Sequence, residues 1–278
     1  APFVMPKSDS AFGRDMQVYD TTIGWRFINP KMEQMYGVDA MGETAENVAQ
    51  DYQISRADQD AFALASQQRW ARAQAAGFFR NEIIAVELAG KKGAVTVFDT
   101  DEHPRPDTTL EQLSRLKPVT REGGTVTAGN ASQQNDAAAA CLVVAEDRLE
   151  ALGLEPIAFL RGWAAAGCHP ATMGIGPVPA VQKLFQKTGL GFDDLDLVEL
   201  NEAFAAQALA VLRAWGWHDP SRLNVNGSGI SLGHPIGATG LRIATTLTHE
   251  LKRRGGRYGL ETMCIGGGQG LAAIFERA

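Results

Sequence analysis

Cysteine is scarce in this sequence. The three cysteines, Cys141, Cys168 and Cys264, are too few and too scattered for a disulfide framework, and none is at metal-ligand spacing from another cysteine or a histidine. Hydrophobic runs are interrupted well before the roughly 20 residues that a membrane-spanning helix needs. These absences exclude small disulfide-stapled folds and transmembrane proteins, and they predict a protein of the reducing cytoplasm that binds no metal.

Positive charge is also in short supply. The 26 Lys and Arg residues are outnumbered by 32 Asp and Glu residues, so the net charge is -6. A nucleic-acid surface needs clustered Lys and Arg, so no nucleic-acid partner is expected. The sequence has no Gly-x-Ser-x-Gly, His-Glu-x-x-His or Gly-Lys-Thr motif, which argues against the usual hydrolases, zinc proteases and kinases. Chemistry on small molecules is the expectation that remains.

The sequence does contain an alternation of strand and helix patterns. Residues 1 to about 50 are punctuated by Pro and Gly and are expected to be a long loop-like region. A helix is predicted between Ser55 and Gly77, followed by two strands around a turn at 89–93. From about residue 155, strands and helices alternate regularly, and two adjacent strands end the chain. This order predicts an α/β fold, layered around a mixed sheet.

His234 lies in the segment SLGHPIGATG, between a glycine and a proline. Pro235 is predicted to be the first residue of a helix that ends in a basic cluster, so the imidazole would lie at the positive end of the helix dipole. That position favours a neutral ring, which can accept a proton from a thiol or donate a hydrogen bond to an oxyanion. The alternative is a histidine that only caps the helix.

Cys264 ends an apolar strand and precedes the glycine turn IGGGQG. Too few residues follow Gly270 for the helix and second strand of a dinucleotide-binding fingerprint. A thiol exposed by such a turn can act as a base or a nucleophile near His234, although a buried cysteine is more often inert packing. Cys141 and Cys168 are expected to be structural.

Asn201 follows the strand pattern LDLVEL and precedes the helix pattern EAFAAQALAVL. It can cap that helix, or it can hold a water or a carbonyl oxygen at the carboxyl edge of the sheet, where ligands of α/β folds collect. Glu202, in the expected first turn, is explained by the helix dipole.

Three segments near the C-terminus resemble, in sequence and order, the signature blocks of the thiolases: NEAFAAQ at 201–207, NVNGSGISLGHPIGATG at 224–240 and MCIGGGQG at 263–270. GTVTAGNASQQNDAAAA at 124–140 is similar to the substrate-loop block of the family, with Gln133 and Gln134 where glycine and an apolar residue are commoner. The segments DTTIGWRFINPKM and DEHPRPDTT are most similar to the degradative branch that acts on β-ketoadipyl-CoA. The resemblance covers essentially the whole chain and implies a thiolase-like fold.

The resemblance also implies roles for individual residues. His234 would activate a nucleophilic cysteine and contribute to an oxyanion hole, and Asn201 would hold a water that completes a second oxyanion hole for the enolate. Cys264 would exchange a proton with the acetyl methyl carbon. Preorganised donors of this kind are the largest single contribution to stabilising an enolate. The implied substrate-binding residues are Ser132 and Ala128 along the pantetheine channel, Met41, Ala203 and Phe204 around the thioester, and Gly266.

The implied domain organisation is incomplete. It consists of a loop domain for substrate binding and oligomerisation at 1–130, the closing strand and helix of the N-terminal half at 131–154, and a C-terminal thiolase domain at 155–278. In the family, the acyl-accepting cysteine precedes the loop domain, and neither Cys141 nor Cys168 stands in the matching motif. The chain therefore resembles a thiolase without its N-terminal third, and it is expected to be inactive alone.

The implied function is that of an acetyl-CoA acyltransferase. The parent enzyme would cleave a 3-oxoacyl-CoA, such as 3-oxoadipyl-CoA, into acetyl-CoA and a shortened acyl-CoA, with coenzyme A as substrate and no cofactor. Homodimers or homotetramers are expected. Two alternatives stay open: a non-catalytic acyl-CoA-binding module of the same fold, and an acyl hydrolase with Cys264 as its nucleophile.

Overall fold

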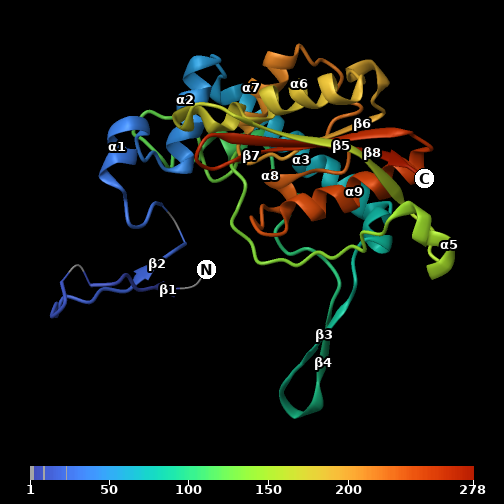
Figure 1. Cartoon of the computed structure of the whole chain (residues 1–278), viewed down its shortest axis with the longest axis horizontal. Coiled ribbons are helices and arrows are strands. Elements are labelled where there is room, and N and C mark those ends of the chain that lie inside the picture. Colours follow the sequence, from blue (N-terminus) through green and yellow to red (C-terminus); the bar gives the residue numbers. More distant parts are fainter. Residues whose placement is uncertain (1–2, 9, 23) are drawn as a thin grey trace.

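A mixed sheet forms the centre of the molecule. The computed structural model describes residues 3–8, 10–22 and 24–278. The strands β6 (Leu197–Leu200) and β7 (Tyr258–Ile265) run parallel to each other, whereas the other neighbouring pairs of the sheet are antiparallel. The α/β fold with a mixed sheet is therefore confirmed. In spatial order the strands are β5 (Ala158–Gly167), β8 (Gln269–Arg277), β7 (Tyr258–Ile265) and β6 (Leu197–Leu200) (Figure 1).

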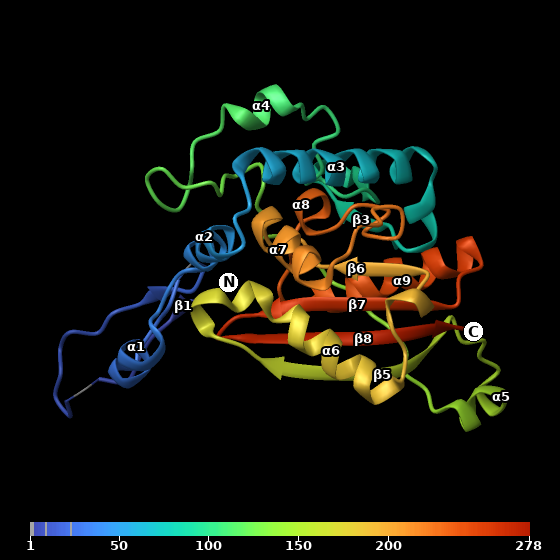
Figure 2. The same cartoon turned by 90° about the horizontal axis from the view of Figure 1, so that it is seen from above.

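Helices cover both faces of this sheet (Figures 1 and 2). α6 (Pro177–Thr188) and α7 (Ala205–Trp215) lie on one face, and α9 (Thr239–Arg254) lies on the other. β6 reads Leu-Val-Glu-Leu without polar alternation because all four of its side chains are buried between these layers. The main core is formed by apolar side chains of the sheet, α6 and α7, among them Leu184, Val211, Leu260 and Ile274.

The last two strands form the hairpin expected from the sequence. β7 and β8 are joined by residues 266–268, in which Gly267 and Gly268 have φ values of 86° and 92°. A Cβ atom on Gly268 would lie 2.4 Å from the carbonyl oxygen of Cys168. The turn therefore needs glycine both for its left-handed backbone and for a close approach to a second segment.

The loop-like region predicted for the first fifty residues holds for most of the described residues before 30 but is wrong beyond that point, where two helices occur. α1 begins with Asn29 as its N-cap and Pro30 in its first turn, a start signal that is present in the sequence. α2 packs through Val48 and Ala49 next to α7, so tertiary contact stabilises a helix that the local pattern does not reveal. The elements of this part are β1 (Phe3–Val4), β2 (Tyr19–Asp20), α1 (Pro30–Tyr36) and α2 (Met41–Asp51).

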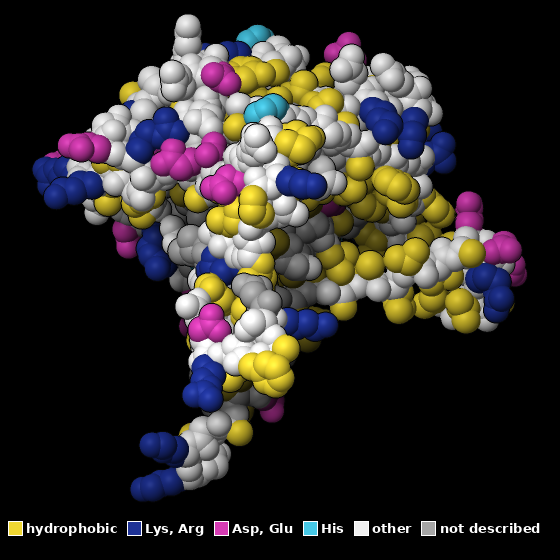
Figure 3. Space-filling view, turned by 60° about the vertical axis from the view of Figure 1, so that its left-hand side comes forward, with side chains coloured by type: hydrophobic (Ala, Val, Ile, Leu, Met, Phe, Trp, Pro, Cys, Tyr) yellow, Lys and Arg dark blue, Asp and Glu magenta, His cyan; other side chains and the backbone are white. Residues whose placement is uncertain are grey.

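The elements that follow agree with the sequence. In α3 (Arg56–Ala75), Ser55 Oγ accepts a hydrogen bond from Asp58 N, and the chain leaves the helix at the left-handed Gly77. β3 (Val86–Ala89) and β4 (Val95–Phe98) pair as an antiparallel hairpin whose residues are all exposed. This hairpin projects from the molecule, with basic side chains at its far end (Figures 1 and 3). α4 (Leu110–Ser114) comes next, with a capping box at Thr109.

The segment 131–154 lacks its expected closing strand. Residues 132–145 form neither strand nor helix, and Leu142 and Val143 are 82% and 93% exposed. A strand needs a hydrogen-bonding neighbour, and no strand of the described residues pairs with this segment. The expected helix is reduced to α5 (Leu149–Leu152), which ends at the left-handed Gly153.

Within the predicted alternation of strands and helices, the segment RLNVNGS forms only a single bridge, between Leu223 and Val198. Asn224 has a φ of 44°, and this left-handed conformation ends the extended pairing.

Within the described ranges, no helix combines the length and the apolar character needed to cross a membrane. The remaining short elements are α8 (Gly229–Leu232) and 3-10 turns at Phe78–Asn81, Lys91–Gly93, Glu146–Arg148, Pro170–Ile175 and Phe192–Asp194.

Candidate active site

Asn201 lies at the carboxyl end of β6 and is fully buried. Its backbone N donates to Thr262 O at 3.0 Å, which keeps it beside the parallel strand β7. α7 begins only at Ala205, with Phe204 in the N-cap position, so the interpretation of Asn201 as a helix cap is wrong. The sequence left a chemical role as the alternative, and the surroundings of the side chain are consistent with that alternative.

The side-chain oxygen of Asn201 has no partner. Oδ1 is buried and accepts no hydrogen bond from any described residue. A Cβ on Gly229 would lie 2.9 Å from this oxygen, so glycine leaves the space next to it open. Leaving a buried amide oxygen unpaired costs about 1–3 kcal/mol, unless a water or a substrate supplies the missing donor. The site is thus built to receive a donor at Oδ1.

His234 lies beside this amide. Asn201 Nδ2 is 3.4 Å from Nε2 and 3.5 Å from Nδ1 of the ring. The backbone N of His234 donates to Gln133 O at 3.0 Å and to Asn135 Oδ1 at 3.2 Å, which fixes the loop that carries the ring. The prediction that Pro235 is the first residue of the helix is wrong. A turn at 235–238 comes first, and α9 begins at Thr239.

A hydroxyl on α9 selects the tautomer of His234. Nδ1 lies 2.6 Å from Thr239 Oγ1, and that hydroxyl donates its single hydrogen to Pro235 O at 2.8 Å. The hydroxyl therefore accepts from the ring, so Nδ1 carries the proton and Nε2 keeps its lone pair. In this state Nε2 is available as a base.

The ring of His234 is neutral at pH 7. Burial, and secondarily the guanidinium of Arg242, lowers the pKa of His234 to about 4. The guanidinium nitrogens of Arg242 are themselves buried and have no hydrogen-bond partner among the described residues. The sequence indicated a neutral ring because of a helix dipole, whereas the structure attributes it to burial and a neighbouring cation.

Cys264 lies at the same edge of the sheet. It is in β7, just beyond the Thr262 that binds Asn201, and it pairs with Gly270 of β8. Burial raises the pKa of the Cys264 thiol to about 12, and the nearby Cys168 acts in the same direction. At neutral pH Cys264 is therefore a protonated thiol. Cys168 and the exposed Cys141 are free as well.

Backbone hydrogen bonds join the substrate-loop residues to the start of α7. Ser132 N donates to Ala203 O at 2.8 Å, and Ala131 forms an isolated bridge with Phe204. Two of the expected substrate-binding residues, Ala203 and Phe204, are thus held directly against the loop that carries a third, Ser132. Met41, at the start of α2, reaches the glycine turn, where its Cε lies 4.0 Å from the position of a Cβ on Gly266.

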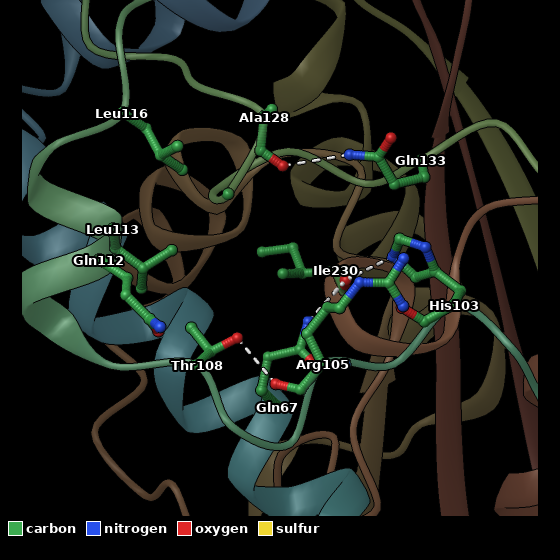
Figure 4. Close-up of a pocket in the computed structure, with 11 residues that line it drawn as sticks. Gln67, His103, Arg105, Thr108, Gln112, Leu113, Leu116, Ala128, Gln133 and Ile230 are labelled. Atoms are coloured by element: carbon green, nitrogen blue, oxygen red, sulfur yellow. Dashed lines mark hydrogen bonds between the residues drawn. The ribbon is translucent and has the colours of Figure 1, made fainter.

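A cavity of about 360 Å³ opens beside this loop (Figure 4). His103 Nε2 donates to Ile230 O at 3.2 Å, and the backbone N of Arg105 donates to Gln67 Oε1 at 2.8 Å, so the His103 ring and the Arg105 main chain are anchored at its wall. Sequence reasoning used DEHPRPDTT only as a mark of the subfamily and missed these residues. The lining is completed by Thr108, Gln112, Leu113, Leu116, Ala128, Gly129 and Gln133.

Glu202 is a second residue whose role was misjudged. It lies outside α7 and is fully buried, so it does not serve the dipole of that helix. Its carboxylate accepts hydrogen bonds from Ser66 Oγ at 2.6 Å, Asn224 Nδ2 at 2.8 Å and Ile230 N at 3.3 Å. Glu202 thereby connects the Asn201 segment to the glycine loop that leads to His234.

Comparison with known proteins gives matches over nearly the whole chain. Two family models match: "Thiolase, N-terminal domain" over residues 10–147 and "Thiolase, C-terminal domain" over residues 154–277. The chain is 58% identical to the β-ketoadipyl-CoA thiolase of Pseudomonas aeruginosa and 55% identical to the 3-oxoadipyl-CoA/3-oxo-5,6-dehydrosuberyl-CoA thiolase of Escherichia coli. Each match uses 100% of this chain and 69% of the relative.

Solved structures agree with this assignment. The acetyl-CoA acetyltransferase of Bacillus anthracis is similar with a TM-score of 0.85 and 40% identity, over 99% of this chain and 68% of that chain. Human mitochondrial 3-ketoacyl-CoA thiolase has a TM-score of 0.85 and 42% identity, over 100% and 69% of the two chains. The sequence motifs, the fold and the relatives agree, and the chain belongs to the thiolase family.

Proposed function

We propose that this chain carries the enolate-handling part of a thiolase that cleaves 3-oxoacyl-CoA, with 3-oxoadipyl-CoA as its substrate. The reaction yields acetyl-CoA and an acyl-CoA shortened by two carbons. The relatives named above as β-ketoadipyl-CoA and 3-oxoadipyl-CoA thiolases support this substrate. The observation that carries the proposal is the side chain of Asn201: its Nδ2 contacts the neutral ring of His234, and its buried Oδ1 has no hydrogen-bond partner among the described residues.

Cleavage of the carbon–carbon bond leaves the electron pair on acetyl-CoA as an enolate, and the two polar groups suit that charge. His234 Nε2, which carries the lone pair of the ring, takes the proton of the nucleophilic thiol and then becomes an N–H donor. A water bound to Asn201 Oδ1 would present a second donor to the enolate oxygen. Donors fixed in advance in this way stabilise the charge as it develops.

Cys264 is suited to give the proton that ends this step. Because the pKa of its thiol is raised to about 12, the group is protonated at neutral pH. Its proton moves to the methylene carbon of the enolate, giving acetyl-CoA and a Cys264 thiolate. The thiol of incoming coenzyme A returns a proton to that thiolate and then attacks the acyl-enzyme, and the nucleophilic thiolate that leaves takes back the proton held by His234. The cycle thus closes without a cofactor.

The acyl-accepting thiol is a different group. A nucleophilic cysteine needs an accessible thiolate, and burial moves both Cys264 and Cys168 away from that state. Cys141 is exposed in a segment with no regular structure. These facts weigh against an acyl hydrolase based on Cys264, and we propose that the 278-residue chain alone gives no thiolysis.

The cavity lined by His103, Arg105 and Ala128 is proposed to take part of the coenzyme A arm, because it lies next to the loop that carries Ser132. Homodimers or homotetramers and a cytoplasmic location are also proposed. Free thiols at all three cysteines support a reducing compartment.

Deuterium exchange at the methyl group of acetyl-CoA tests the function without an acyl-accepting cysteine. In D2O the chain should deuterate this methyl group, and Cys264→Ala should abolish the exchange while acetyl-CoA still binds. Cys141→Ala is the matched control and should keep the full rate. A chain that binds acetyl-CoA but exchanges nothing, or exchanges equally well as Cys264→Ala, would contradict the proposal.

A further inference from the structure

A second cavity, of about 200 Å³, lies away from the candidate active site. It is bounded by the last turns of α3, the loop 220–226 and the C-terminal end of α9. None of its lining residues belongs to the first cavity. The lining consists of Arg69, Arg72, Ala73, Phe78, Pro220, Ser221, Val225, Asn226 and Arg254.

Three arginines and no carboxylate line this cavity. Arg69 is held against its wall by a hydrogen bond from Nη2 to Pro220 O at 3.2 Å, and Arg254 is anchored by Glu250 and by Ser221 O. Among the described residues, Arg72 has no ion pair and no side-chain hydrogen bond. The pKa of Arg69 is lowered mainly by burial, and Glu202 opposes this shift. The guanidinium of Arg72 is close enough to lower the pKa of Arg69 further.

Neighbouring groups do not cancel this charge. Glu250 binds both Arg253 and Arg254, so one carboxylate serves two cations. The ends of α3 and α9 each contribute about half a negative charge at most. Glu199 and Glu202 also attract Arg69, but neither carboxyl belongs to the lining of the cavity. A surplus of positive charge therefore remains at the cavity wall for a ligand.

We propose that this cavity binds a phosphate group, either free or on a small phosphomonoester. Guanidinium groups present paired N–H donors that match the oxygens of phosphate, and a phosphate dianion matches the charge surplus. The volume suits such a group with a small substituent. The exposed, unpaired Arg72 is the residue that would turn toward the ligand, while Arg69 and Arg254 are already fixed.

Calorimetric titration of the 278-residue chain with inorganic phosphate, at constant ionic strength set with KCl, tests this site. We expect saturable binding that Arg72→Ala weakens about tenfold to a hundredfold, while Arg72→Lys keeps more of the affinity because it keeps the charge. A parallel titration with glycerol 3-phosphate distinguishes free phosphate from a phosphomonoester as the ligand. Tighter binding of glycerol 3-phosphate would show that the site recognises the substituent, and tighter binding of inorganic phosphate would show that it does not.

Two control variants locate the binding. Arg115→Ala removes an exposed arginine that directly follows α4, outside the second cavity, and should leave phosphate affinity unchanged. Arg105→Ala changes the first cavity and should also leave it unchanged. The proposal is overturned if phosphate does not bind, if Arg72→Ala binds as tightly as the unmodified chain, or if only Arg105→Ala loses binding. Coenzyme A binding in Arg72→Ala is the independent readout of the proposed function and should be preserved.

Discussion

Residues before 155 and residues from 155 onward hold their side chains by different means. In the later region, β6 is buried throughout and α7 buries most of its length. In the earlier region, α1 buries no residue and the β3–β4 hairpin is exposed throughout. The candidate catalytic residues Asn201, His234 and Cys264 all belong to the later region. The geometry of the candidate catalytic residues therefore depends on core packing, whereas the loops proposed to contact substrate depend on a few hydrogen bonds to that core.

Two asparagines near the end of β6 sharpen the comparison within the packed region. Asn224 and Asn201 are both fully buried. Asn224 accepts from Leu200 N and donates to Leu200 O and Glu202 Oε1, each at 2.8 Å. Asn201 leaves its oxygen unpaired. The first amide is structural, and the second has the open valence that a binding group requires.

The largest expected difference between the regions is in stability. Leu260→Ala should lower the free energy of unfolding by about 2–5 kcal/mol, because it opens a void in the main core. Val97→Ala, in the exposed hairpin, should change it by less than about 0.5 kcal/mol. Urea unfolding followed by circular dichroism measures both variants. Equal losses would show that the hairpin is packed as tightly as the core, against the contrast drawn above.

A second test uses the pH dependence of stability. The pKa of His234 falls from 6.5 to about 4 on folding, so the unfolded chain binds the proton more tightly. Stability should therefore fall as the pH decreases from about 6.5 and level off below about 4, with a total contribution on the order of 3 kcal/mol. Unfolding of the chain and of His234→Gln across this range measures it. A pH profile that the substitution leaves unchanged would contradict the burial of a neutral ring.

A smaller effect is expected at Thr239. Thr239→Val keeps the shape of the side chain but removes the acceptor for His234 Nδ1–H, so the ring loses its selected tautomer. The rate of acetyl-CoA methyl exchange should fall about tenfold, equivalent to about 1.4 kcal/mol. Thr245→Val is the matched control, because Thr245 Oγ1 donates to Leu241 O on the same helix and, among the described residues, to no group of the site. Equal rates in the two variants would remove Thr239 from the site.

The sequence predicted the buried region well because its elements have complete local signals. β7 and β8 around IGGGQG, and α3 between Ser55 and Gly77, carry both the hydrophobic pattern and the residues that end the element. The segment around Leu142 has the pattern of a strand, but strand formation depends on a neighbour that local sequence does not provide. α2 was missed for the converse reason, since its partner α7 is far away in sequence.

The candidate site shows the same division. His234 and Cys264 were found from glycine-flanked motifs, and Asn201 was found between a strand pattern and a helix pattern, all of which is local information. Thr239 has a signal that was available, because it follows His234 by five residues at the mouth of α9. Arg105 and Glu202 have none, since their roles arise from contacts with Gln67, Ser66 and Asn224 made by folding.

The central claim is that Asn201 and His234 act on one enolate oxygen, with His234 Nε2 carrying the proton released by the Cys264 thiol during exchange, and a double-mutant cycle on methyl exchange tests it most directly. Asn201→Ala should slow exchange by about 10²–10³, the usual effect of removing one oxyanion donor. If both groups stabilise the same charge, Asn201→Ala combined with His234→Ala should be little slower than the slower single variant. Losses that simply multiply would contradict the claim, because they would show two groups acting independently.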